Sequence, residues 1–194
     1  MTGTAGGAEG NSPGIVIDHP RRYELFSSLA LPGVRRRMFA RLAELAGTRP
    51  GDRVLDIGCG TGALTRAVAA TVAPGGGVLG IDPSSRMVGY ARDRARRRGE
   101  NSEFAVGTAQ GIDVPDGSFD AVVTSFAVHH VRKDERERAF AEMFRVLRPG
   151  GRLMVADFRG PAERHLEMVS AAGFADLARG RVRPVAHWIT AVRP

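Results

Sequence analysis

The stretch Val54–Gly62, which reads VLDIGCGTG, decides how the rest of the chain is interpreted. Residues 53–57 are mostly apolar and predict a buried strand, which leads directly into three alternating glycines. Glycine allows the backbone to approach a ligand closely, because no Cβ stands in the way. Ligands of open parallel sheets bind at the carboxyl ends of the strands, so we expect a ligand at this loop.

Strand and helix patterns alternate on both sides of this stretch. Before it, apolar residues at helical spacing predict a helix over 34–46. After it, further strands are expected at 78–81, 104–106, 119–125, 152–156, 174–177 and 185–192, with helices between most of them. This alternation predicts an α/β fold with a mostly parallel sheet, and the short link between the last two strands predicts an antiparallel hairpin.

Length and composition limit the organisation of the chain. Its 194 residues suffice for a single α/β domain. We expect a disordered tail over 1–14, an N-terminal lid or helical segment over 15–50, and the main domain over 51–194. No apolar run approaches the roughly 20 residues of a membrane span, and the N-terminus does not resemble a secretory signal. A lone cysteine, Cys59, argues against an internal disulfide and against a metal site, so we expect a soluble, cytoplasmic protein without a metal.

The chain is strongly basic, with a formal net charge of +7 and a pI near 11.0. Only Lys133 among its 28 basic residues is lysine, and arginine, alanine, glycine and proline are all abundant. That composition is typical of a GC-rich genome. The densest basic cluster, residues 92–98, has no interleaved aromatic for base stacking, so a nucleic-acid partner is disfavoured.

Two acidic residues narrow the choice of ligand. Asp56 lies two residues before the first glycine, which suits a cationic ligand better than a pyrophosphate. Asp82 ends the second predicted strand, 20 residues after Gly62, where a carboxylate accepts hydrogen bonds from ribose hydroxyls. NAD enzymes bind ribose with a carboxylate at the same position, so Asp82 does not distinguish the two kinds of cofactor. A structural role for Asp82 as a helix cap is a further alternative.

Four motifs in order carry a family resemblance: residues 54–62, then GIDPS at 80–84, DGSFD at 116–120 and VLRPGG at 146–151. Together they resemble the class I S-adenosylmethionine-dependent methyltransferases, in the methyltransferase type 11 group that contains the ubiquinone/menaquinone biosynthesis enzymes. The resemblance covers roughly Tyr23 to the C-terminus. It implies a Rossmann-like, doubly wound seven-stranded sheet, S-adenosylmethionine as cofactor and S-adenosylhomocysteine as product.

The resemblance also implies a role for individual residues. The methionine part of the cofactor is expected near Asp56, Gly58, Gly60 and Thr65, and its ribose at Asp82. The remaining cofactor-binding residues are expected to be Tyr23, Pro83, Met87, Thr108, Ala109 and Ser125, with Met87 packing on the adenine and Ser125 beneath the sulfonium. Relatives usually carry Asp or Asn where this chain has Thr108, and a hydroxyl binds the adenine amino group more weakly than a carboxylate does.

Methyl transfer from a sulfonium needs mainly alignment and exclusion of water, and a base only where the acceptor must lose a proton. His129 and His130 follow the fourth strand and Asp157 follows the fifth, so all three are expected at the pocket opening as catalytic residues. A structural role for one histidine is the alternative.

The acceptor is expected to be a small molecule, with Tyr23, Phe26 and the helix over 34–46 as a lid. The chain lacks an N/D-P-P-Y/F stretch after the fourth strand, which argues against amino-methylation of adenine or glutamine. Alternatives are a lipid or quinone methyltransferase on a membrane surface, a dinucleotide-dependent oxidoreductase and a non-catalytic cofactor-binding protein. The oligomeric state is expected to be monomer or homodimer.

Overall fold

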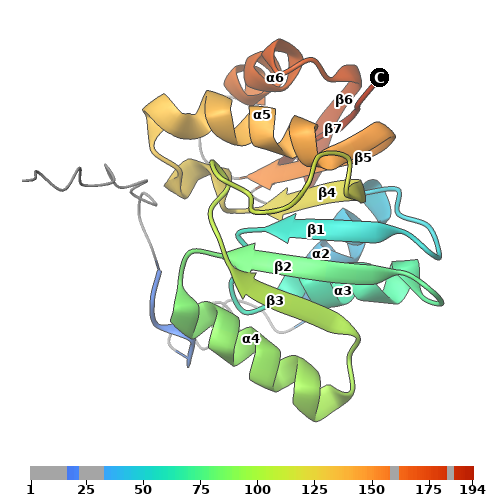
Figure 1. The fold of residues 1–194 in the computed structure, drawn as a ribbon, viewed down its shortest axis with the longest axis vertical. Helices are drawn as coiled ribbons and strands as arrows, with labels where there is room; N and C mark the ends of the chain where they lie inside the picture. The colour runs from blue at the N-terminus through green and yellow to red at the C-terminus, as the bar shows by residue number, and fades with distance from the viewer. Residues whose placement is uncertain (1–16, 22–32, 158–161, 183–185) are drawn as a thin grey trace, which may run out of the picture.

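The computed structural model describes residues 17–21, 33–157, 162–182 and 186–194. Within these residues seven strands form one sheet with the order β3-β2-β1-β4-β5-β7-β6 (Figure 1). The strands are β1 (Arg53–Ile57), β2 (Gly77–Asp82), β3 (Ser102–Val106), β4 (Phe119–Ser125), β5 (Leu147–Asp157), β6 (Ala175–Val182) and β7 (Ala186–Val192). Strands β1 to β5 run parallel, whereas β7 is antiparallel to both β5 and β6. The predicted sheet and its C-terminal hairpin are confirmed.

Helices cover both faces of the sheet (Figure 1). On one face α2 (Val34–Leu45) and α3 (Ala63–Val72) build a core with the sheet, and α5 (Arg136–Val146) and α6 (Ala162–Ala171) build one on the other. Helix α4 (Ser85–Arg98) packs on β2 and β3, and the short 3-10 helices η1 (Val128–His130) and η2 (Lys133–Glu135) lead from β4 to α5. This layering leaves the carboxyl ends of β1, β2 and β4 at one edge of the molecule.

Two local details differ from the sequence-based expectation. The helical spacing of Val34, Met38, Leu42 and Leu45 predicts that these four side chains form the apolar face, whereas α2 buries Phe39, Leu42 and Ala43 and leaves Val34 40% exposed. Phe39 packs edge to face on the ring of Phe126, and this contact fixes which side of α2 faces the sheet. Strand β5 begins at Leu147 rather than 152, because Leu147 already pairs with β4.

Arg193, just after β7, closes the C-terminal end of α5. Its guanidinium donates to the backbone carbonyls of Phe144, Arg145 and Leu147 and lies 4.6 Å from the centre of the Phe144 ring. A helix end leaves carbonyl groups without intrahelical partners, so this side chain satisfies groups that α5 cannot satisfy itself.

Among the described residues, no helix combines the length and apolar character needed to cross a membrane.

Candidate active site

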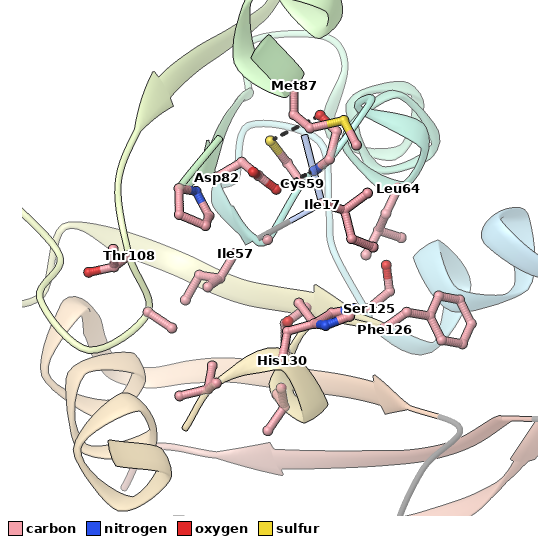
Figure 2. Close-up of a pocket in the computed structure, with 18 of the residues that line it drawn as sticks. Ile17, Ile57, Cys59, Leu64, Asp82, Met87, Thr108, Ser125, Phe126 and His130 are labelled. Atoms are coloured by element: carbon pink, nitrogen blue, oxygen red, sulfur yellow. Dashed lines mark hydrogen bonds between the residues drawn. The ribbon is translucent and has the colours of Figure 1, made fainter. Parts of the chain in front are cut away.

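A pocket opens at the carboxyl ends of β1, β2 and β4, where the sequence predicts a ligand. Its wall is formed by the glycine loop, the end of β2, the loop 107–110, the end of β4 with η1, and the first turns of α2. Figure 2 shows Asp82 and Thr108 on one side of the pocket and Ser125 and Phe126 on the other.

The glycine loop is held against β2 and forms part of the pocket wall. The backbone N–H groups of Gly58 and Cys59 both donate to the carbonyl of Ile81, at 2.8 and 3.0 Å. Gly58 has φ +70°, and a Cβ there would lie 2.3 Å from the Cβ of Ala127. Gly60 has φ +53° and lines the pocket, and a Cβ there would have no atom within 4 Å. Burial raises the pKa of the Cys59 thiol, so it stays neutral in this loop.

Asp82 joins the loop to the start of α4. Its Oδ2 accepts the Gly60 N–H and its Oδ1 accepts the Ser84 N–H, both at 2.9 Å. Burial raises the pKa of Asp82, against the opposing effect of these two N–H donors. Since Asp82 lines the pocket with Pro83 and Met87, its remaining acceptor positions are available to a ligand.

Asp56 and Thr65 are fully buried beside the glycine loop rather than on the pocket wall. The Thr65 hydroxyl donates to Oδ2 of Asp56 at 2.6 Å, and Oδ1 has no hydrogen-bond partner among the described residues. Burial raises the pKa of Asp56 to about 7, and the nearby carboxylate of Asp82 adds to this, although the Thr65 hydroxyl lowers it. A positive charge bound in the pocket would favour the ionised form of Asp56.

Thr108 and Ala109 line the pocket as the resemblance implies. Their loop is fixed from α5, where Arg145 donates to the carbonyls of Ile112 at 2.8 Å and Val114 at 2.9 Å. The anchored loop therefore presents both residues to the pocket.

Two polar residues on the wall were missed by the sequence analysis. Gln110 is 2% exposed and Thr124 is fully buried, yet both line the pocket. Neither Nε2 of Gln110 nor Oγ1 of Thr124 has a hydrogen-bond partner among the described residues. Buried polar atoms are nearly always paired, so a ligand that pairs them accounts for their position. The only sequence signal is that each stands directly next to an expected site residue.

Replacing Gln110 with methionine is expected to weaken cofactor binding by about tenfold while the free protein keeps or gains stability. Methionine is of similar size and removes the buried Nε2 donor, which has no hydrogen-bond partner among the described residues. Calorimetric titration with S-adenosylhomocysteine and a denaturant melt of the same sample measure both effects. Unchanged affinity would contradict a ligand contact at this amide.

The two histidines occupy different positions relative to the pocket. His130 lines it, whereas His129 turns towards Asp157, with Nδ1 2.7 Å from Oδ1 and its backbone N–H 3.0 Å from Oδ2. Asp157 is fully buried, so it does not face the opening as expected but fixes the η1 turn from β5. Arg136 supports the same turn by donating to the carbonyls of His129 and Val131, both at 3.1 Å.

The N-terminal segment contributes to the pocket in part. Ile17 lies on the wall (Figure 2). The adjacent Asp18 accepts a 2.6 Å hydrogen bond from the Ser84 hydroxyl. Helix α2 adds Arg35 and Phe39. Tyr23, Phe26 and the tail over 1–14 lie outside the described residues.

Comparisons with known proteins identify the family of this chain. Residues 54–151 match the family described as "Methyltransferase domain". The ubiquinone/menaquinone biosynthesis C-methyltransferase UbiE of Ectopseudomonas mendocina is 39% identical over 150 residues, which are 76% of this chain and 58% of that protein. The chain thus spans less than two thirds of the length of this relative.

Two solved structures share the fold. The [4+2]-cyclase SpnF is 26% identical with a TM-score of 0.74, covering 82% of this chain and 80% of that one. An S-adenosylmethionine-dependent methyltransferase from Aquifex aeolicus is 23% identical with a TM-score of 0.72, covering 91% and 99%. Because the family match spans more than half of its residues, the chain belongs to the class I S-adenosylmethionine-dependent methyltransferase family.

Proposed function

We propose that this chain transfers the methyl group of S-adenosylmethionine to a small-molecule acceptor by in-line displacement. The observation that carries the proposal is the pocket itself. It joins a glycine loop, the buried acid Asp82, and the side chains of Gln110 and Thr124, each with a buried polar atom that is unpaired within the described part of the chain. The relative UbiE is named as a ubiquinone/menaquinone biosynthesis C-methyltransferase, which supports a conjugated ring as the acceptor.

The residues present fit this cofactor. The open space at Gly60 leaves room for a ligand against the loop, and the acids Asp56 and Asp82 suit a ligand with positive charges. Gln110 and Thr124 offer polar atoms to a nucleoside. We assign the ribose to Asp82, the methionine part to Gly58 and Gly60, the adenine to Pro83, Met87, Thr108 and Ala109, and a place beneath the sulfonium to Ser125.

When bound, S-adenosylmethionine supplies a methyl group activated on a sulfonium. The chain's own residues then orient the acceptor and exclude water, for which the pocket wall provides apolar side chains, among them Ile57, Leu64 and Met143. His130 is the side chain placed to hold a proton lost by the acceptor. Asp157 and His129 keep the η1 turn, and so His130, in position.

Calorimetric titration with S-adenosylmethionine, S-adenosylhomocysteine and NADH tests the cofactor. We expect micromolar binding of the two sulfur compounds and none of NADH. Binding of NADH alone would overturn the proposal in favour of an oxidoreductase. Since one structure with this fold is a [4+2]-cyclase, transfer of label from methyl-labelled cofactor to a quinol acceptor is the decisive measurement of activity.

Asp157→Asn is expected to lower kcat by at least about tenfold while the affinity for S-adenosylhomocysteine changes less than twofold. The amide offers one acceptor oxygen where the carboxylate accepts the His129 backbone N–H and faces its Nδ1, so the charged partner of the ring is lost and the η1 turn with His130 is held less firmly. Steady-state kinetics alongside calorimetry separate the two effects. Asp134→Asn, on an exposed side chain in η2, is the control. An equal fall in cofactor affinity would instead indicate a structural role.

A membrane-surface location is a second candidate, favoured by the exposed arginines Arg36 and Arg37 on the helix that borders the pocket. We expect co-sedimentation with anionic vesicles at low salt that is lost at high salt. Equal sedimentation with neutral vesicles, or none with either, would remove this candidate.

A further inference from the structure

The two charged side chains on the pocket wall, among the described residues, lie on opposite sides of the end of β1. Asp82 ends β2, and Arg35 on α2 borders the pocket beside the end of β4. Strands β2 and β4 flank β1, so their ends are separated by about 10 Å. One cavity therefore has an acidic part, which suits the cationic cofactor, and a separate part bordered by a cation.

The part near Arg35 is bordered by two aromatic rings. Phe39 and Phe126 pack edge to face, with ring centres 6.2 Å apart, and both line the pocket (Figure 2 shows Phe126). Phe126 has φ +56°, a left-handed conformation that is unfavourable for a non-glycine residue. Its backbone N–H donates to the Ala156 carbonyl at 2.8 Å, which holds the residue in this conformation. Strain of this kind is concentrated at ligand-binding positions.

Arg35 and Phe39 stand one helical turn apart on α2, so the same face presents a cation and a ring. The Arg35 guanidinium lies 5.5 Å from the centre of the Phe39 ring, and both side chains border the cavity. A guanidinium binds carboxylates and phenolates with charge-assisted hydrogen bonds and repels an ammonium group.

We infer that this end of the pocket binds an aromatic anion, with its ring against Phe39 and Phe126 and its carboxylate or phenolate at Arg35. The inference rests on the proposed function in one respect, which is that the bound anion is the methyl acceptor. It selects among acceptors, since it disfavours ammonium compounds and favours rings that carry a carboxylate or an ionised hydroxyl, as a quinol does when it loses a proton. An ionised oxygen on the ring also makes the neighbouring oxygen or ring carbon more nucleophilic.

The test uses the full chain and two fluorescent probes that differ by one charge, 3-hydroxy-2-naphthoate and 2-naphthol. Both are titrated in the presence and absence of saturating S-adenosylhomocysteine. We expect the naphthoate to bind at least about tenfold more tightly than the naphthol, and Arg35→Gln to remove this preference. Arg36→Gln is the matched control, because it removes the same charge from an exposed neighbouring position of α2.

Each result decides the inference. Loss of naphthoate binding in Arg35→Gln but not in Arg36→Gln supports it, as does weaker binding of both probes in Phe126→Leu. An equal loss in both arginine variants, or equal affinity of the unaltered protein for the two probes, would overturn it. The titration with S-adenosylhomocysteine tests the proposed function separately. If the protein does not bind S-adenosylhomocysteine, the proposed function fails, and the preference for naphthoate is still measured without it.

Discussion

Replacing Asp82 with alanine is expected to weaken binding of S-adenosylmethionine by about a hundredfold. The change removes the carboxylate proposed to hold the ribose, at about 1.5–3 kcal/mol for each charge-assisted hydrogen bond. It also frees the N–H groups of Gly60 and Ser84, which the two carboxylate oxygens now hold at 2.9 Å. The glycine loop and the start of α4 therefore lose a shared hydrogen-bond acceptor. For this reason the affinity for S-adenosylmethionine falls by more than the removal of the ribose contact alone would cause.

Calorimetry with S-adenosylmethionine measures this effect, and Asp93→Ala provides the matched control. Asp93 is an exposed acid on α4, so the control removes the same charge from the same part of the molecule. Comparable affinities in the two variants would show that Asp82 does not contact the cofactor.

Replacing Asp56 with asparagine is expected to change how stability depends on pH. The folded chain holds the Asp56 proton up to a pKa of about 7, whereas the unfolded chain loses it near the ordinary value of 3.8. Between these values the folded state binds more protons, so the stability of the unaltered protein falls as pH rises and levels off above about pH 7. One pKa unit corresponds to about 1.4 kcal/mol. Between pH 4.5 and pH 8, the free energy of unfolding of the asparagine variant is therefore expected to rise by about 2–4 kcal/mol relative to that of the unaltered protein.

Denaturant unfolding at the two pH values measures this difference. Asp113→Asn, on an exposed side chain, is the control and should leave the pH dependence unchanged. The same Asp56 variant is expected to bind S-adenosylmethionine about tenfold more weakly at pH 8, because a neutral amide does not attract the sulfonium. Parallel pH profiles of variant and unaltered protein would contradict a protonated Asp56.

Much of the fold could be predicted because its signals are local in sequence. Apolar runs separated by glycine and proline mark the strands. The serine after Asp82-Pro83 is a residue type that caps helices, and the Ser84 hydroxyl accepts the Met87 N–H at 3.1 Å. The positions of the glycine loop and Asp82 at one sheet edge follow from the rule for parallel sheets.

Other parts of the site depend on which side chains meet across the fold. Nothing in the sequence pairs His129 with Asp157, which places Asp157 in the core rather than at the opening. Arg35 and Phe39 reach the pocket only because Phe39 packs on Phe126, whose left-handed backbone has no sequence signal. Gln110 and Thr124 stand out only once burial and hydrogen bonds are known.

The cap that Arg193 provides for α5 has a consequence for cooperativity. Arg193 follows β7, and α5 precedes β5, so this contact joins two distant parts of the sequence. If either β7 or α5 opened alone, the last carbonyls of α5 would lose their hydrogen-bond partner. The C-terminal hairpin and α5 therefore form one cooperative unit of unfolding. Since α5 carries Met143 of the pocket wall and Arg145 of the loop anchor, a fluctuation that frees this sheet edge also loosens the binding site.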